Sequence, residues 1–119
     1  MVSGSSSMTE LRRGVVEHCV LALIGEGDAY AFDLARQLSE RGLVAGEGTI
    51  YPLLARLRRE GLVETTWRES VAGSPRRYHR LTDGGRRALD TFIADWSSFR
   101  AAVDSVLDGA MSGGRNDER

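Results

Sequence analysis

Arginine is the residue type in this sequence best placed to do chemistry, because nine arginines fall between Thr49 and Arg87. Only four acids share that stretch, which therefore carries a net charge of +5, whereas residues 1–48 and 88–119 each carry −3. The planar guanidinium group donates paired hydrogen bonds that match phosphate and carboxylate oxygens. This distribution predicts a surface that binds DNA phosphates, although a solvated arginine-rich face is the structural alternative.

The charge of the whole chain conceals this concentration. The 119 residues hold 16 basic and 17 acidic side chains, for a net charge of −1, and every basic residue is an arginine. A near-neutral total argues against nucleic-acid binding until the charge is divided by segment. The absence of lysine fits codon bias as well as phosphate recognition.

Other chemistry has little support. His18 and His79 are far apart and no pattern of acids completes a metal site, while the single Cys19 excludes an internal disulfide and a paired-cysteine site. No phosphate-binding loop, nucleophile motif or pair of catalytic carboxylates is present. We therefore expect no catalysis, cofactor or metal. The chain also lacks a signal peptide and a membrane-length apolar run, which favours the cytoplasm.

The spacing of apolar residues predicts an order of elements. Helices are expected over residues 10–24 and 30–41, with Asp28 as a candidate cap of the second, and a third helix ends at Glu60. Two strands over residues 62–68 and 76–81 form a hairpin. A long helix follows to residue 108, with Thr82 as its N-cap.

Three helices and a hairpin define a mainly α fold, a winged helix-turn-helix with a β-hairpin wing, to which a long C-terminal dimerisation helix is added. The expected organisation is a disordered lead-in (1–9), the DNA-binding domain (10–81), the dimerisation helix (82–108) and a disordered tail (109–119). In this fold, the second helix of the helix-turn-helix pair enters the major groove with its N-terminal residues forward.

This geometry selects the candidate DNA contacts. Hydroxyl and methyl groups at the start of the third helix can touch bases or phosphates, and an arginine follows one turn later. The wing arginines suit the backbone or minor groove. The predicted DNA-binding residues are Tyr30, Thr49, Tyr51, Pro52, Arg56, Arg76 and Arg77. For Tyr51, a half-buried packing role is the alternative.

Two runs of sequence carry a resemblance to a known family. The run GEGTIYPLLARLRREGLVE and the later run GSPRRYHRLTDGGRRAL resemble the PadR family of winged-helix transcriptional regulators, and the similarity covers about residues 11–107. The single last helix resembles the compact subgroup. The resemblance implies a homodimeric, ligand-responsive repressor on a pseudo-palindromic operator. Ser74 departs from the family, which more often has arginine there.

The last helix carries an apolar stripe that a monomer would leave exposed, which predicts a dimer interface. We assign to this interface Leu89, Phe92, Phe99, Val103 and Leu107. The family resemblance further implies a cavity at the dimer centre where flat apolar ligands stack, with the lining residues Val15, His18, Cys19, Ala22, Ile93 and Trp96. For Trp96, simple packing in the dimer core is the alternative.

The sequence therefore predicts a DNA-binding transcriptional regulator, a homodimeric repressor that a small aromatic or apolar ligand releases from double-stranded DNA. Two alternatives stay open. The first is a winged-helix adaptor whose arginines bind an acidic protein, and the second is a constitutive DNA binder without an effector. Neither a membrane partner nor a cofactor is expected.

Overall fold

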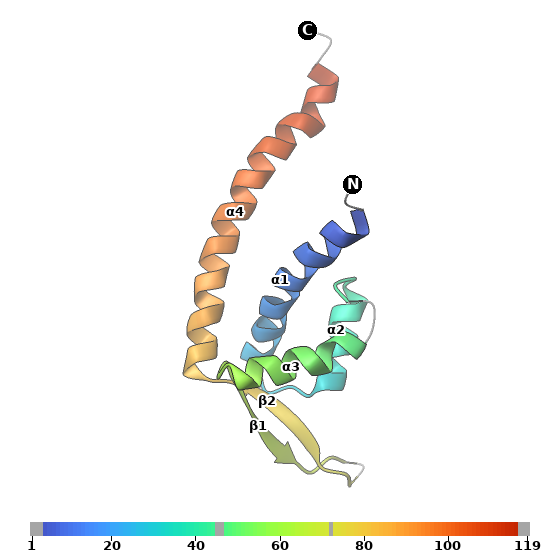
Figure 1. Cartoon of the computed structure of the whole chain (residues 1–119), viewed down its shortest axis with the longest axis vertical. Helices are drawn as coiled ribbons and strands as arrows, with labels where there is room; N and C mark the ends of the chain where they lie inside the picture. Colours follow the sequence, from blue (N-terminus) through green and yellow to red (C-terminus); the bar gives the residue numbers. More distant parts are fainter. Residues whose placement is uncertain (1–3, 45–46, 72, 117–119) are drawn as a thin grey trace. The chain divides into compact units, whose positions relative to one another are not determined.

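A computed structural model of the chain describes residues 4–44, 47–71 and 73–116, with the side chains of residues 14–44, 48–71 and 73–112. The chain divides into two compact units, Met1–Leu89 and Asp90–Arg119. The elements run in the order α1 (Gly4–Gly25), α2 (Ala31–Glu40), the short 3-10 helix η1 (Glu47–Thr49), α3 (Ile50–Arg59), β1 (Val63–Arg68), β2 (Arg76–Leu81) and α4 (Asp83–Asn116). Figure 1 labels the four α-helices and the two strands. The predicted fold class, three helices, a hairpin and a long last helix, is confirmed.

The first and last helices of the chain, α1 and α4, are longer than predicted. α1 begins at Gly4, whereas the prediction placed its start at residue 10, and α4 continues to Asn116 beyond the predicted end at residue 108. Small polar residues and glycines suggested disorder in both segments. A helix extends far more easily than it nucleates, so such residues can continue an existing helix. Residues 1–3 and 117–119 of the predicted lead-in and tail lie outside the described residues.

The helix ends depend on two glycines that the sequence pattern had marked as stops. Gly42 and Gly61 have φ values of 75° and 78°, in the left-handed region that costs glycine little. After α3, the Leu62 amide donates to the Leu57 carbonyl at 2.9 Å, which closes the helix end. Asp28 does not cap α2, so that prediction was wrong: the N-cap is Tyr30, without a side-chain cap, because Asp28 pairs with arginines of the hairpin.

One hydrophobic core joins the elements of the first unit. α1, α2 and α3 each bury an apolar stripe at helical spacing, and β1 and the start of α4 close the core with one residue each. The buried apolar residues are Val16, Val20, Leu21, Leu23, Ile24, Ala31, Leu34, Ala35, Leu38, Ile50, Leu54, Leu57, Val63 and Leu89. Leu89, which we predicted in the dimer interface, is only 4% exposed and packs in the core of its own chain.

The base of the hairpin adjoins two helices, because β1 follows α3 and β2 leads into α4. β1 and β2 pair antiparallel, from Val63 opposite Leu81 to Arg68 opposite Arg76. At the α4 end, the Thr82 hydroxyl donates to the Gly61 carbonyl at 2.6 Å and accepts the Gly85 amide at 3.0 Å. Thr82 is thus the predicted N-cap of α4. It also ties the end of α3 to the end of the wing.

Candidate nucleic-acid interface

The nine arginines of the basic stretch fall into two groups. Arg56 donates to Glu17 at 2.8 Å, and both Arg68 and Arg80 donate to Asp28. Among the described side chains, the other six lack an acidic partner within ion-pair distance: Arg58, Arg59, Arg76, Arg77, Arg86 and Arg87. These six cations keep their capacity to pair with an external anion.

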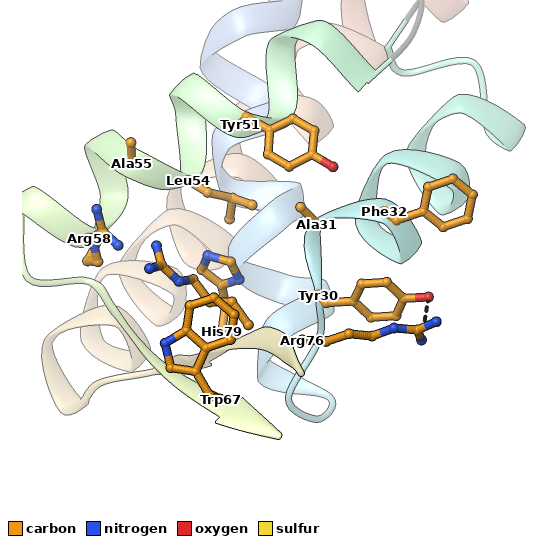
Figure 2. Close-up of a pocket in the computed structure, with 11 residues that line it drawn as sticks. Tyr30, Ala31, Phe32, Tyr51, Leu54, Ala55, Arg58, Trp67, Arg76 and His79 are labelled. Carbon is orange, nitrogen blue, oxygen red and sulfur yellow. Dashed lines mark hydrogen bonds between the residues drawn. The ribbon is translucent and has the colours of Figure 1, made fainter. Parts of the chain in front are cut away.

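Three of these unpaired arginines line one concavity of about 360 Å³ between the start of α2, α3 and the hairpin, shown in Figure 2. Its lining combines aromatic rings, arginines, a histidine and aliphatic side chains, and none of its lining residues is acidic. The lining residues are Tyr30, Ala31, Phe32, Tyr51, Leu54, Ala55, Arg58, Trp67, Arg76, Arg77 and His79. This arrangement suits an anion with carbon-rich groups beside it, such as the sugar–phosphate backbone of a nucleic acid.

Aromatic rings hold the wing arginines in place. The Arg76 guanidinium lies 4.6 Å from the centre of the Tyr30 ring and donates to the Tyr30 hydroxyl at 3.0 Å, the contact marked by the dashed line in Figure 2. The Arg77 guanidinium lies 4.9 Å from the Trp67 ring centre. A cation over a ring face is attracted by the ring quadrupole, and stacking leaves the edge of the guanidinium available to donate.

His79 is the buried polar residue among those that line this concavity. Its side chain is 6% exposed, and its Nδ1 atom has no hydrogen-bond partner among the described residues. Burial lowers the pKa of the His79 ring, and the nearby Arg77 and Arg58 cations lower it further. A neutral ring therefore lies near these arginines and adds no repulsion at neutral pH.

The start of α3 presents its predicted contacts to solvent. Thr49, Tyr51 and Pro52 are all exposed, although Tyr51, at 53% exposure, also lines the concavity, so its packing role stays an alternative. The Thr49 hydroxyl makes no cap hydrogen bond to α3. These groups are therefore not committed to the fold. Whether they touch DNA stays a prediction.

Arg56, also a predicted contact, is held differently. Its ion pair with Glu17 connects α3 to α1, and the Arg56 side chain is 37% exposed. A direct contact with DNA would compete with this pair, so Arg58 has the more available charge on α3.

The predicted interface and cavity residues divide between the two units. Val15, His18, Cys19 and Ala22 are half-buried on α1, and burial raises the pKa of the Cys19 thiol. On α4, Phe92, Trp96 and Phe99 form an aromatic row with ring centres 6.1 and 6.3 Å apart. Four other large apolar side chains among those described on this helix are about half exposed or more: Ile93, Val106, Leu107 and Met111. The dimer and its cavity stay predictions.

The sequence pattern did not indicate the role of Trp67 and His79 in the concavity, and it suggested the wrong contact for Asp28. It left Arg58 as a doubtful DNA contact with Glu40 or Glu64 as alternative partners, whereas Arg58 pairs with neither among the described side chains and lines the concavity. The alternation of aromatic and basic residues in the strands, with Trp67 opposite Arg77, is the one signal that could have indicated a stacked pair.

The fold and this interface define a class of protein, the winged helix-turn-helix DNA-binding proteins. Residues 20–91 match the transcriptional regulator PadR-like family, so the chain belongs to that family. It is a DNA-binding transcriptional regulator and not an enzyme, as the resemblance implied. In the described part of the chain, no helix is both long and apolar enough to cross a membrane.

Solved structures and a curated relative agree with this assignment. A PadR-like transcriptional regulator from Bacillus cereus is 34% identical with a TM-score of 0.77, over 82% of this chain and 96% of the other. A PadR-like transcription factor from Bacteroides fragilis is 36% identical with a TM-score of 0.70, over 85% and 98% of the two chains. The transcriptional regulator Rv3488 of Mycobacterium tuberculosis is 35% identical over 69% of this chain and 76% of its own length.

Proposed function

We propose that this protein is a homodimeric repressor that binds a pseudo-palindromic operator, with α3 in the major groove and the wing on the DNA backbone. The observation that carries the proposal is the concavity in which Arg58, Arg76 and Arg77 have no acidic partner among the described side chains. A phosphodiester seated there would meet cations from both α3 and β2. Phosphate contacts of this kind fix the register of a protein on DNA.

Sequence reading is assigned to the exposed start of α3. Thr49, Tyr51 and Pro52 are the forward residues and would meet base edges, while Tyr30 would meet the backbone. Phosphate contacts act on all sequences alike, whereas base contacts separate the operator from other DNA. The two sets of residues therefore have different signatures in a binding experiment.

The test is a salt titration on a DNA fragment from upstream of the protein's own gene, with a random fragment of equal length beside it. Each phosphate contact contributes about −0.9 to the slope of log K against log salt. Arg77→Ala should flatten that slope by about 1 on both fragments. Arg36→Ala is the matched control, because Arg36 pairs with Asp33 and Glu40 on the outer face of α2. An unchanged slope for Arg77→Ala means that the wing does not touch DNA.

The same experiment separates the two alternatives. A winged-helix adaptor that binds an acidic protein should bind neither fragment even at low salt. If Thr49→Ala weakens operator binding without altering binding to random DNA, sequence reading by α3 is supported. Equal losses on both fragments contradict that assignment.

The dimer proposal rests on the exposed apolar face of α4. Phe92, Phe99, Val103 and Leu107 are its proposed interface residues, and a face with Phe99 at 60% exposure is unusual on a monomer. Sedimentation of the protein and of a Phe99→Glu variant tests this assignment. If the wild-type protein and the Phe99→Glu variant both sediment at the monomer mass, the assignment is contradicted. The two half-sites of a dimer's operator would lie one DNA turn, about 34 Å, apart.

Release by a flat apolar ligand is the second part of the proposal. Trp96, Ile93 and the α1 residues Val15, His18, Cys19 and Ala22 would line the ligand site. A Trp67→Phe background isolates Trp96 fluorescence, and planar aromatic compounds should then change both its emission and operator affinity. Unchanged values of both would favour a constitutive DNA binder. A regulator of this kind works beside the chromosome, so the cytoplasm is its proposed location.

A further inference from the structure

The connection between α1 and α2 contacts the wing through three consecutive residues, which we call the clasp: Asp28, Ala29 and Tyr30. Asp28 is the first of them, and it accepts hydrogen bonds from an arginine on each strand of the hairpin. Arg80 donates through Nε at 3.3 Å and through a terminal nitrogen at 3.0 Å, in a two-point contact, and Arg68 donates from β1. One carboxylate therefore ties both strands to the helices.

The next two residues of the clasp strengthen the same attachment. Ala29 and His79 exchange backbone hydrogen bonds of 2.7 and 3.1 Å, so the connection pairs with β2 through a single antiparallel bridge. The Tyr30 hydroxyl accepts from Arg76, and the Tyr30 ring lies 5.5 Å from the Tyr78 ring. Since Tyr30 is also the N-cap of α2, the wing is held against the helix-turn-helix itself.

The negative charge of Asp28 opposes the binding of DNA phosphates, so its presence needs a reason other than charge. Asp28 is an acid among the cations of a surface proposed to bind DNA phosphates, and it engages two of the nine arginines of the basic stretch. Its side chain is 17% exposed, and hydrogen bonds from Arg80, with the charges of Arg80 and Arg68, lower its pKa. The carboxylate therefore stays charged at neutral pH. If binding to DNA required charge alone, an asparagine here would be better.

We infer that Asp28 is a positioning residue for operator binding: it fixes the wing relative to α3, so that the wing arginines and the α3 start meet one DNA site together. This inference rests on the proposed function. Two contact surfaces gain from being joined only when their separation matches the DNA. A wing released from the clasp would still attract phosphates, with Arg68 freed and Arg80 left only with its 4.0 Å contact to Glu64 among the described acids, but it would no longer hold the register of α3 on the operator.

The perturbation is Asp28→Asn, measured on the operator fragment and on a random fragment of equal length. Operator affinity is expected to fall about tenfold, while affinity for random DNA stays the same or rises and its salt slope steepens by about 1 for each freed arginine that meets a phosphate. Asp33→Asn is the matched control, because it removes the same charge and, among the described side chains, Asp33 pairs with Arg36 of its own helix alone, at 3.6 Å. It should shift both affinities together.

Two results would overturn the inference. A rise in both affinities for Asp28→Asn would mean that its effect is charge alone. A proportional fall in both, with a lower unfolding temperature, would mean that Asp28 only stabilises the fold. If Asp28→Asn does not fold, Arg80→Gln tests the same contact from the wing side, and it should reduce operator affinity more than random-DNA affinity, with equal reductions counting against the clasp.

A second measurement needs no DNA, so it separates the clasp from the proposed function. Hydrogen exchange at the amides of Ala29 and His79 reports opening between the clasp and the wing. Asp28→Asn should speed exchange at these two amides at least fivefold and leave the amides of α2 unchanged. Asp33→Asn should leave Ala29 and His79 unchanged. Unchanged exchange in Asp28→Asn contradicts the clasp even if the wild-type protein binds its operator.

Discussion

Two adjacent glycines at the start of α4 should respond to alanine in opposite directions. A Cβ atom on Gly85 would lie 2.0 Å from the Leu62 carbonyl oxygen, a backbone atom that also accepts the Thr82 amide at 3.2 Å. A Cβ atom on Gly84 would lie 3.6 Å from its nearest neighbours, in ordinary van der Waals contact. The two changes add the same methyl group to the same helix, so they differ only in the contact.

The expected difference follows from three terms. Overpacking costs about 1–3 kcal/mol, the lost hydrogen bond about 1 kcal/mol, and alanine returns about 1 kcal/mol of helix propensity. Gly85→Ala should therefore lower the free energy of unfolding by about 2 kcal/mol, whereas Gly84→Ala should raise it by up to about 1 kcal/mol. For a chain of this size, that separates the two unfolding temperatures by about 12 °C.

The assay is thermal unfolding followed by circular dichroism, with all proteins at one concentration because association shifts the midpoint. Gly84→Ala is the internal control for helix propensity. If Gly85→Ala unfolds at or above the temperature of Gly84→Ala, α4 does not rest on the Leu62 carbonyl, and the described packing of α4 against the end of α3 is refuted.

Three further predictions use other parts of the first unit. His79 has a folded-state pKa below its ordinary value of 6.5, so the unfolded chain takes up the proton first as the pH falls below about 6.5, and stability is lost on that side; His79→Gln should flatten this loss in unfolding curves measured between pH 7 and 5. Leu57→Ala, at a fully buried position, should cost about 2–5 kcal/mol in urea unfolding, whereas Val71→Ala on the exposed wing tip should stay within about 0.5 kcal/mol, and equal effects would contradict the core. Arg77→Lys keeps the charge but loses the face that stacks on Trp67, so operator affinity should fall about 2–5-fold at an unchanged salt slope, and full retention of affinity would refute a role for stacking.

The fold was predictable where local signals agree. The apolar stripes of α2 and α3, the glycines that end them and the β-branched and aromatic strands each indicate the same elements, so the order of helices and strands followed from the sequence. Thr82 was likewise predictable as a cap, because a threonine before an acid and a long apolar repeat is a strong start signal.

The contacts between distant segments were not predictable. Asp28 before a helix reads equally well as a cap, and its actual partners lie 40 and 52 residues away in the sequence. Leu89 continues the apolar repeat of α4, and periodicity does not distinguish a residue that packs on its own core from one that awaits a second chain. Arg56 similarly looks like its neighbours until Glu17 is placed beside it.

The stacking of Arg76 on Tyr30 and of Arg77 on Trp67 also bears on the entropy of binding. A free arginine side chain samples many rotamers and loses up to about 2 kcal/mol of that freedom when a phosphate immobilises it. Here the rings have restricted the rotamers before any DNA arrives, so part of that loss is borne by folding. A lysine side chain, which lacks a flat face to stack on a ring, would lose this conformational freedom when it binds the phosphate. The arginine-only composition, which codon bias alone could explain, thus has a thermodynamic consequence at these two positions.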